Sequence, residues 1–257
     1  MQHLRAAFSF FGHTRLRHWP GLAFYFFGWM CYRILGVRLF QERRLHLKNL
    51  VINADVEGQS GLIFLHEILI QQIYDVAPIS QAEGIRVVFD AGANCGFYSL
   101  VTVLQHPERR VFCFEPHPVT FTRLQQNIRC NGLENRITPV QAAAGSAPGR
   151  CTLETSVASS MGVVTASQVA AGHRLVEVPM VSLDDYARTQ SLYPDLIKID
   201  VEGFEVEVLK GARICLEKAR YVILEVHSDE LARDSLQLLH EARFQTRQQG
   251  ALIFANK

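Results

Sequence analysis

Four continuous apolar runs, each followed by a segment with helical spacing, limit the folds that this chain can adopt. The runs are RVVFD, which ends at Asp90, RVFCFE at Glu115, LIKID at Asp200, and YVILEV, which ends just before His227. Unbroken apolar strands separated by amphipathic helices are typical of a mostly parallel sheet with helices on both faces. The sequence therefore predicts an α/β fold of the Rossmann-like, doubly wound type.

Other segments extend this sheet. FQTRQ and LIFAN flank Gly250, which predicts an antiparallel hairpin at the C-terminal end. We expect a mostly parallel seven-stranded sheet that includes this hairpin, in one domain over residues 45–257. Hydrophobic spacing predicts three more elements: a strand over 46–55, a helix over 62–74, and a single helix over 204–216.

Residues 1–44 form a basic, aromatic N-terminal segment. Its first 41 residues contain five arginines and no acidic residue, and the run from Trp19 to Tyr32 is uncharged. This run is shorter than the roughly 20 apolar residues that span a bilayer, and no A-x-A-like cleavage site follows it, which argues against a signal peptide. Two interpretations stay open: a helix that packs on the domain, which we favour, and peripheral membrane contact through residues 1–41.

The overall charge and the cysteines narrow the class of protein. A net charge of +1 and a pI near 7.7 give no general attraction to nucleic acid, so no nucleic-acid partner is expected. The six cysteines include no C-x-x-C pair, and buried thiols without partners are typical of a reducing compartment. We therefore expect a cytoplasmic location, and the sequence does not predict an oligomeric state.

Ligands of such sheets bind beyond the carboxyl ends of the strands, and the first of these ends carries the turn DAGANCG. Its glycines, Gly92 and Gly96, are spaced G-x-x-x-G. A dinucleotide-binding turn has the pattern G-x-G-x-x-G, and a phosphate-binding P-loop ends in Gly-Lys-Ser/Thr. The turn therefore argues against both NAD and nucleoside triphosphates, and Asp90 before it is a better neighbour for an ammonium group than for a phosphate.

Glu115 ends the next strand, where an acidic side chain can accept hydrogen bonds from both hydroxyls of a ribose. Together with Asp90, it describes a ligand with an unphosphorylated ribose and a cationic, amino-acid-like tail. S-adenosylmethionine is such a molecule. Either acidic residue alone often caps a turn, but the pair at this spacing favours a cofactor site.

The chain resembles the FkbM-type members of the class I S-adenosylmethionine-dependent methyltransferases. Their pattern is D-x-G-A-N-x-G-x-Y-S, then F-E-P, N-x-x-x-N and K-I-D-V-E-G. The matching residues here are DAGANCGFYS (90–99), FEPHP (114–118), Asn127 with Asn131, VSLDDY (181–186) and IKIDVEG (197–203). The resemblance covers roughly residues 45 to 230 and implies the class I methyltransferase fold.

The resemblance also implies roles for particular residues. Gly92, Asn94 and Gly96 are expected to line the methionine portion of the cofactor, and Glu115 to hold its ribose. Ala142 and Ala143, in the turn QAAAG, are expected to border the adenine. Glu67, in the helix before the first strand, is expected to match a glutamate that such proteins often carry.

The acceptor side is expected to use residues at the next two strand ends. Transfer of a methyl group to a hydroxyl requires a base, and His227 and Asp200 are the two candidates, with Glu202 positioning the acceptor. In the plainer alternative, Glu202 and His227 only orient loops. No metal site is predicted, although a divalent ion on these three side chains stays an alternative.

The family implies O-methylation, commonly of a sugar, another glycan or a secondary metabolite, so a small-molecule or glycan acceptor is expected. The segment from Thr155 to Gly172, rich in Ser, Ala and Gly, is a candidate lid over the acceptor. Three other functions stay open: N- or C-methylation, a degenerate methyltransferase fold that serves as a membrane-associated binding module, and, least favoured, an NAD oxidoreductase.

Overall fold

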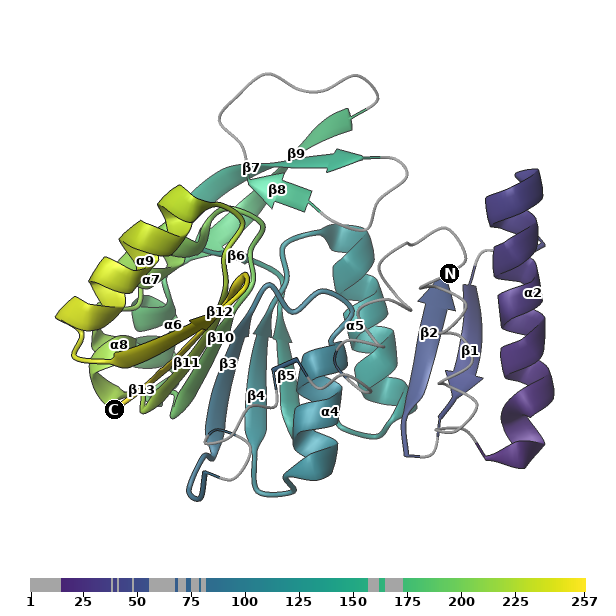
Figure 1. The fold of residues 1–257 in the computed structure, drawn as a ribbon, viewed down its shortest axis with the longest axis horizontal. Coiled ribbons are helices and arrows are strands. Elements are labelled where there is room, and N and C mark those ends of the chain that lie inside the picture. The colour runs from purple at the N-terminus through teal and green to yellow at the C-terminus, as the bar shows by residue number, and fades with distance from the viewer. Residues whose placement is uncertain are drawn as a thin grey trace.

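The computed structural model describes residues 15–37, 39–40, 42–47, 49–55, 68, 73–74, 79, 82–156, 162–164 and 173–257. A seven-stranded sheet forms the centre of the fold, in the order β12-β13-β11-β10-β3-β4-β5 (Figure 1). Its strands are β3 (Val87–Ala91), β4 (Arg110–Phe114), β5 (Ile137–Val140), β10 (Leu196–Ile199), β11 (Tyr221–Glu225), β12 (Gln245–Gln249) and β13 (Leu252–Asn256). The first five are mutually parallel, and β13 and β12 add the antiparallel hairpin, so the predicted sheet is confirmed.

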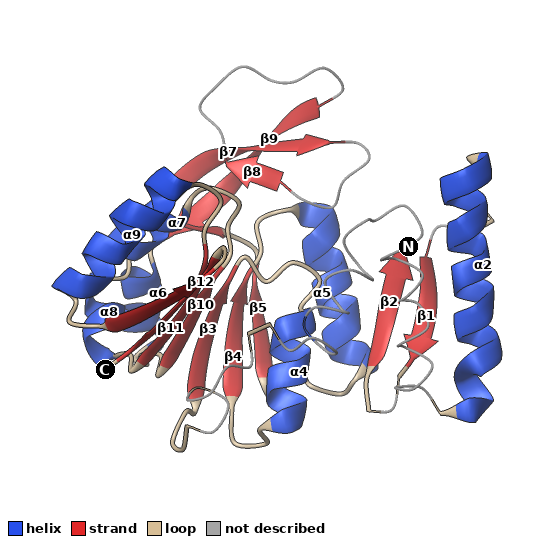
Figure 2. Ribbon diagram, in the orientation of Figure 1, coloured by secondary structure: helices blue, strands red, loops and turns tan. Residues whose placement is uncertain are grey.

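Helices cover both faces of this sheet (Figure 2). Alternate residues of β3 explain the arrangement, because Val88 belongs to one buried cluster and Phe89 to another. Side chains of α4 and α5 complete the first cluster, and side chains of α6 to α9 complete the second. The helices are α4 (Phe97–Gln105), α5 (Pro118–Cys130), α6 (Leu183–Gln190), α7 (Glu205–Lys210), α8 (Arg213–Lys218) and α9 (Asp229–Glu241).

The strand order places a topological switch point between β3 and β10. Chain order runs outward from β3 through β4 and β5 in one direction, and through β10 and β11 in the other. The connections therefore leave the carboxyl ends of β3 and β10 in opposite directions, which opens the edge where ligands bind in such sheets. The residues singled out from the sequence follow these strand ends.

A second, four-stranded sheet was not predicted. Its order is β6-β9-β7-β8, and Figure 1 shows it toward the top, beyond the ends of β3 to β5. The long pair β7–β9 is antiparallel, and Leu153 and Val178 bury a small core of their own. Most of the candidate lid lies outside the described residues. The strands are β6 (Ala143–Ala144), β7 (Gly149–Ser156), β8 (Gly162–Val164) and β9 (His173–Val181).

The N-terminal segment packs on the domain through a helix and a hairpin. After the short helix η1 (Leu16–His18), α2 (Trp19–Leu35) packs on β1 (Glu42–His46), which pairs antiparallel with β2 (Val51–Asp55). Leu22 and Tyr25 of α2 are buried in the same cluster as Val88. This burial supports the packing interpretation, which stays a prediction, as does peripheral membrane contact. Among the described residues, no helix is long and apolar enough to cross a membrane.

Two predicted elements are wrong in detail. The single strand over 46–55 is broken by a turn, closed by the hydrogen bond from Leu47 N to Leu50 O at 2.8 Å, because the hairpin pairs with itself and not with the main sheet. The single helix over 204–216 is split into α7 and α8 at Gly211. A Cβ at Gly211 would lie 2.0 Å from the carbonyl oxygen of Gly145, so the backbones approach too closely for a regular side-chain-bearing helix.

Two asparagines, Asn127 in α5 and Asn131 at the C-cap of α5, bind the edge of β2. Asn131 accepts a hydrogen bond from Val51 N (2.8 Å) and donates to Val51 O (2.6 Å), and Asn127 accepts from Asn53 N (2.8 Å). An asparagine side chain offers the same donor and acceptor groups as a peptide unit. The pair, four residues apart on one helical face, therefore takes the place of a neighbouring strand.

We predict that Asn131→Ala loosens the hairpin, because the partly buried polar groups of Val51 lose their partners at about 1 kcal/mol for each lost contact. Hydrogen exchange followed by mass spectrometry should show faster exchange over β1 and β2. Arg129→Ala, an exposed change in α5 two residues before Asn131, is the control. Equal exchange in the two variants would contradict this role for Asn131.

Candidate active site

The end of β3 carries a buried ion pair. Asp90 is fully buried, accepts a hydrogen bond from Ser99 Oγ at 2.6 Å, and lies 3.3 Å from Lys198 Nζ. Lys198 lies 3.4 Å from Asp200 and donates to Gly92 O at 3.0 Å. Burial alone would lower the pKa of Lys198, but Asp90 and then Asp200 outweigh burial and raise it, so the lysine is charged.

The turn after β3 has a backbone that few residues can adopt. Gly92, Asn94 and Gly96 have φ angles of 77°, 52° and 83°. A Cβ at Gly92 would lie 1.7 Å from the carbonyl oxygen of Asp200, so only glycine fits there. The turn is attached to β4, because the amide N–H groups of Gly92 and Ala93 both donate to Phe114 O, at 3.0 and 3.1 Å.

Glu115 joins the turn to the end of β4. Its Oε2 accepts from Asn94 N at 2.9 Å and its Oε1 from His117 N at 2.8 Å, and the side chain is almost fully buried. Burial raises the pKa of Glu115 to about 7, against the lowering effect of these two N–H groups. Each carboxylate oxygen keeps a second lone pair, so Glu115 can accept two more hydrogen bonds.

Three further residues were predicted to contact the cofactor, and two of them lie in the described part of the chain. Ala142 and Ala143 are buried just beyond β5, whose Val140 O accepts a hydrogen bond from Glu115 N at 3.1 Å. They therefore follow the strand next to Glu115, and their role at the adenine stays a prediction. Glu67 lies outside the described residues, and its role stays a prediction.

Asp200, Glu202 and His227 come together at the ends of β10 and β11. His227 Nε2 lies 3.3 Å from Glu202 Oε2 and 3.9 Å from Asp200 Oδ1. One ligand atom from each of the three side chains lies within 4.8 Å of the others, so the group has the ligand types and spacing that could hold a divalent cation. Glu202 has a φ of 51°, a conformation that few non-glycine residues adopt.

Three side chains near this group were not singled out from the sequence. Glu205, fully buried at the start of α7, lies 2.7 Å from His227 Nδ1. Tyr74 donates to Glu225 Oε2 at 2.6 Å and approaches Asp200 Oδ2 at 3.3 Å. Lys198 and Glu205 lie inside or beside the motif IKIDVEG and could have been noticed there, whereas Tyr74 comes from a distant segment with no sequence signal.

The surrounding carboxylates change how His227 ionises. The hydrogen bond with Glu205, followed by the charges of Glu202, Glu205 and Asp200, outweighs partial burial and raises the pKa of His227 to about 9. The pKa of Glu202 is also raised, chiefly by burial. His227 therefore carries a positive charge at neutral pH and releases its proton as the pH approaches 9.

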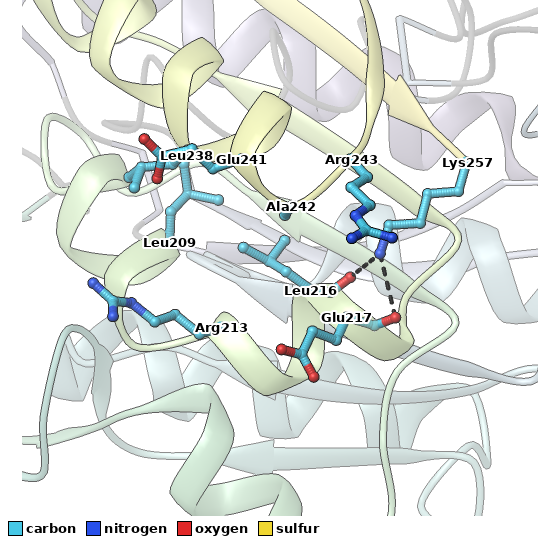
Figure 3. Close-up of a pocket in the computed structure, with 9 residues that line it drawn as sticks. All are labelled: Leu209, Arg213, Leu216, Glu217, Leu238, Glu241, Ala242, Arg243 and Lys257. Atoms are coloured by element: carbon cyan, nitrogen blue, oxygen red, sulfur yellow. Dashed lines mark hydrogen bonds between the residues drawn. The ribbon is translucent and has the colours of Figure 1, made fainter.

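A pocket lies away from these residues, between α7, α8, α9 and the C-terminal residue (Figure 3). Its volume is about 590 Å³, and Lys257 Nζ at its edge donates to the carbonyl oxygens of Leu216 and Glu217 at 2.6 and 3.2 Å. None of the predicted site residues lines it. The lining residues are Leu209, Arg213, Leu216, Glu217, Leu238, Glu241, Ala242, Arg243 and Lys257.

Comparison with known proteins identifies similar sequences. The family model described as "Methyltransferase FkbM domain" matches residues 90–246. The hexuronic acid methyltransferase AglP of Haloferax volcanii is 30% identical over 169 residues, which are 65% of this chain and 67% of AglP. The 31-O-demethyl-FK506 methyltransferase FkbM of Streptomyces tacrolimicus is 26% identical over 211 residues, 71% of this chain and 81% of that enzyme.

Among solved structures, the fold is similar to that of an S-adenosylmethionine-dependent methyltransferase from Agrobacterium tumefaciens. The TM-score is 0.50 and the sequence identity is 12%, over 85% of this chain and 70% of that one. At this identity the likeness concerns the fold alone, and it confirms the class I methyltransferase fold.

We predict that Gly92→Ala destabilises the protein more than Gly132→Ala. Both glycines have a positive φ, but a Cβ at Gly132 would meet open space and one at Gly92 would meet the Asp200 carbonyl. The backbone strain alone costs about 1 kcal/mol, and we expect about 3 kcal/mol or more at Gly92. Urea denaturation measures the two free energies of unfolding, and equal losses would show that the close approach to Asp200 is not tight.

Proposed function

The chain belongs to the FkbM family of methyltransferases, and we propose that it transfers the methyl group of S-adenosylmethionine to a hydroxyl of a small-molecule or glycan acceptor. The main support is the junction of the glycine turn with Glu115, where Asn94 N donates to the carboxylate at 2.9 Å. This contact places Glu115, the proposed partner of the ribose, beside the glycine turn, the proposed partner of the amino-acid portion of the cofactor. A hydroxyl acceptor is favoured because the name of the FkbM relative specifies an oxygen.

The residues present fit this cofactor. Glu115 has lone pairs left for two ribose hydroxyls, and its partners Asn94 and His117 hold it in place. Gly92, Asn94 and Gly96 line the methionine portion in this proposal, and the two alanines after β5 border the adenine. Bound there, S-adenosylmethionine supplies a methyl group activated by a positively charged sulfur.

Asp90 acts as a positioning residue in this proposal. Its carboxylate is buried, accepts from Ser99 and is paired with Lys198, so it already has a cationic partner inside the chain. Lys198 in turn donates to Gly92 O. Asp90 therefore holds the turn that contacts the cofactor, in addition to the predicted attraction for an ammonium group.

His227 is the base that we favour for the acceptor hydroxyl. The His227 side chain is partly exposed, whereas Asp200 is more buried and is already engaged by Lys198 and Tyr74. Glu205 holds the opposite ring nitrogen and so orients the ring. Glu202 positions the acceptor, and neutral His227 receives the proton that the hydroxyl loses.

The other functions differ in what they require. N- or C-methylation would use the same cofactor residues, and the site of the transferred label distinguishes it. A degenerate binding module would not need the intact Glu115 and turn geometry. The pattern of an NAD enzyme is absent from the glycine turn.

The cytoplasmic location stays a prediction, as does the division of the chain between residues 44 and 45, which falls inside β1.

We predict that S-adenosylmethionine binds more weakly as the pH falls through about 7, because the ribose hydroxyls need the ionised form of Glu115. Ionisation is about tenfold rarer one pH unit below the pKa, so the dissociation constant should rise about tenfold from pH 8 to pH 6. Isothermal titration calorimetry measures this dissociation constant, and NAD serves as the negative-control ligand. Glu115→Gln should bind weakly at every pH, and no binding by folded wild-type protein would overturn the cofactor assignment.

We also predict that the rate of methyl transfer rises with pH toward about 9, where His227 becomes neutral. His227→Ala should lower kcat by about 100-fold or more. Glu205→Gln removes the main cause of the raised pKa, so the rising limb should move to lower pH. If the rate of Glu205→Gln rises over the same pH range as that of the wild type, another group accepts the proton.

The function itself is tested with methyl-labelled S-adenosylmethionine and a panel of acceptors that includes hexuronic acids, neutral sugars and hydroxylated polyketides. Mass spectrometry locates the label in the product. Label on an oxygen supports the proposal, whereas label on nitrogen or carbon replaces it with the corresponding alternative. No label on any acceptor, with cofactor binding intact, would favour the binding module.

A further inference from the structure

Helix α2 carries apolar side chains on both of its faces. Its inner face buries Leu22 and Tyr25, at 2% and 0% exposure, against the hairpin and the main core. A helix whose opposite face faces water normally carries polar residues there. The outer face of α2 is apolar, and its large side chains keep the following exposures: Trp19 40%, Phe27 53%, Met30 38% and Ile34 74%.

These exposed residues form one stripe along the helix. Positions 19, 27, 30 and 34, with the exposed Ala23, follow one another at intervals of three or four residues, so they share one face over the length of α2. Seventeen residues extend about 25 Å. Figure 1 shows α2 at the outer edge of the molecule, with β1 and β2 on its inner side.

Arginines lie at the N-terminal end of α2 and on the neighbouring hairpin. Arg15 and Arg17 are exposed just before α2, and Arg43 of the hairpin lies 4.3 Å from the centre of the Phe24 ring. Residues 1–41 contain five arginines and no acidic residue. The first turn of α2 also has no acidic residue and no side-chain cap, so the positive end of the helix dipole adds to the arginines.

We propose that the outer face of α2 enters the interfacial region of an anionic lipid bilayer. Trp and Phe are the side chains that this region favours, and the arginines complement lipid phosphates. The helix lies along the surface because its inner face is already packed on the hairpin. A second copy is a poorer occupant, since two segments that both carry only positive charge would repel each other.

Vesicle flotation of the full chain without S-adenosylmethionine tests this proposal independently of the enzymatic function. The vesicles contain either phosphatidylcholine alone or about one-third phosphatidylglycerol. The wild-type protein should float with the anionic vesicles, and Phe27→Ser/Ile34→Ser should reduce the partition coefficient about tenfold or more. Arg15→Gln/Arg17→Gln should weaken binding to the anionic vesicles, by about fivefold for each arginine.

The matched control is Val119→Ser/Ile214→Ser, which replaces side chains 55% and 46% exposed on α5 and α8. It should float like the wild-type protein. No flotation of the wild type, or equal flotation of Phe27→Ser/Ile34→Ser and Val119→Ser/Ile214→Ser, would overturn the proposal. Light scattering distinguishes the other occupant: a dimer that only Phe27→Ser/Ile34→Ser dissociates, without any loss of flotation, would assign the face to self-association.

Discussion

The ammonium group of Lys198 is buried between the carboxylates of Asp90 and Asp200, and the rest of the site depends on it. These residues come from β3 and β10, the two strands on either side of the switch point. Without the lysine, two carboxylates would face each other at low exposure, which is a costly arrangement. Lys198 also donates to Gly92 O. One cation therefore contacts both the glycine turn and Asp200, which belongs to the group of Asp200, Glu202 and His227.

The junction of the glycine turn with Glu115 could be predicted from the sequence because its signals are local, whereas the cofactor roles of these residues stay predictions. A glycine turn after an apolar strand and an acid at the next strand end follow from periodicity and spacing, and Asn94 N does meet Glu115. The contact of Tyr74 with Asp200 and that of the β2 edge with Asn131 could not be predicted, because the two partners lie 126 and 80 residues apart along the chain. The split of the helix at Gly211 likewise depends on Gly145, which a window over one helix does not include.

The two halves of the site differ in how firmly they are held. Asp90 and Glu115, which we propose to serve the cofactor, are buried, whereas the group of Asp200, Glu202 and His227 is partly exposed. A preorganised donor side beside a more open acceptor side suits a family whose members act on different acceptors. If α2 holds the enzyme on a bilayer, acceptors attached to lipids become accessible to that open side.

Asn127 has a further consequence for how substitutions combine. Its Oδ1 accepts from Asn53 N in β2, and its Nδ2 donates to Cys95 O in the glycine turn at 2.9 Å. One buried amide thus belongs to the network of the N-terminal hairpin and to that of the cofactor turn. Free-energy changes from substitutions in these two regions are therefore expected to be non-additive, although the regions lie more than 40 residues apart in the sequence.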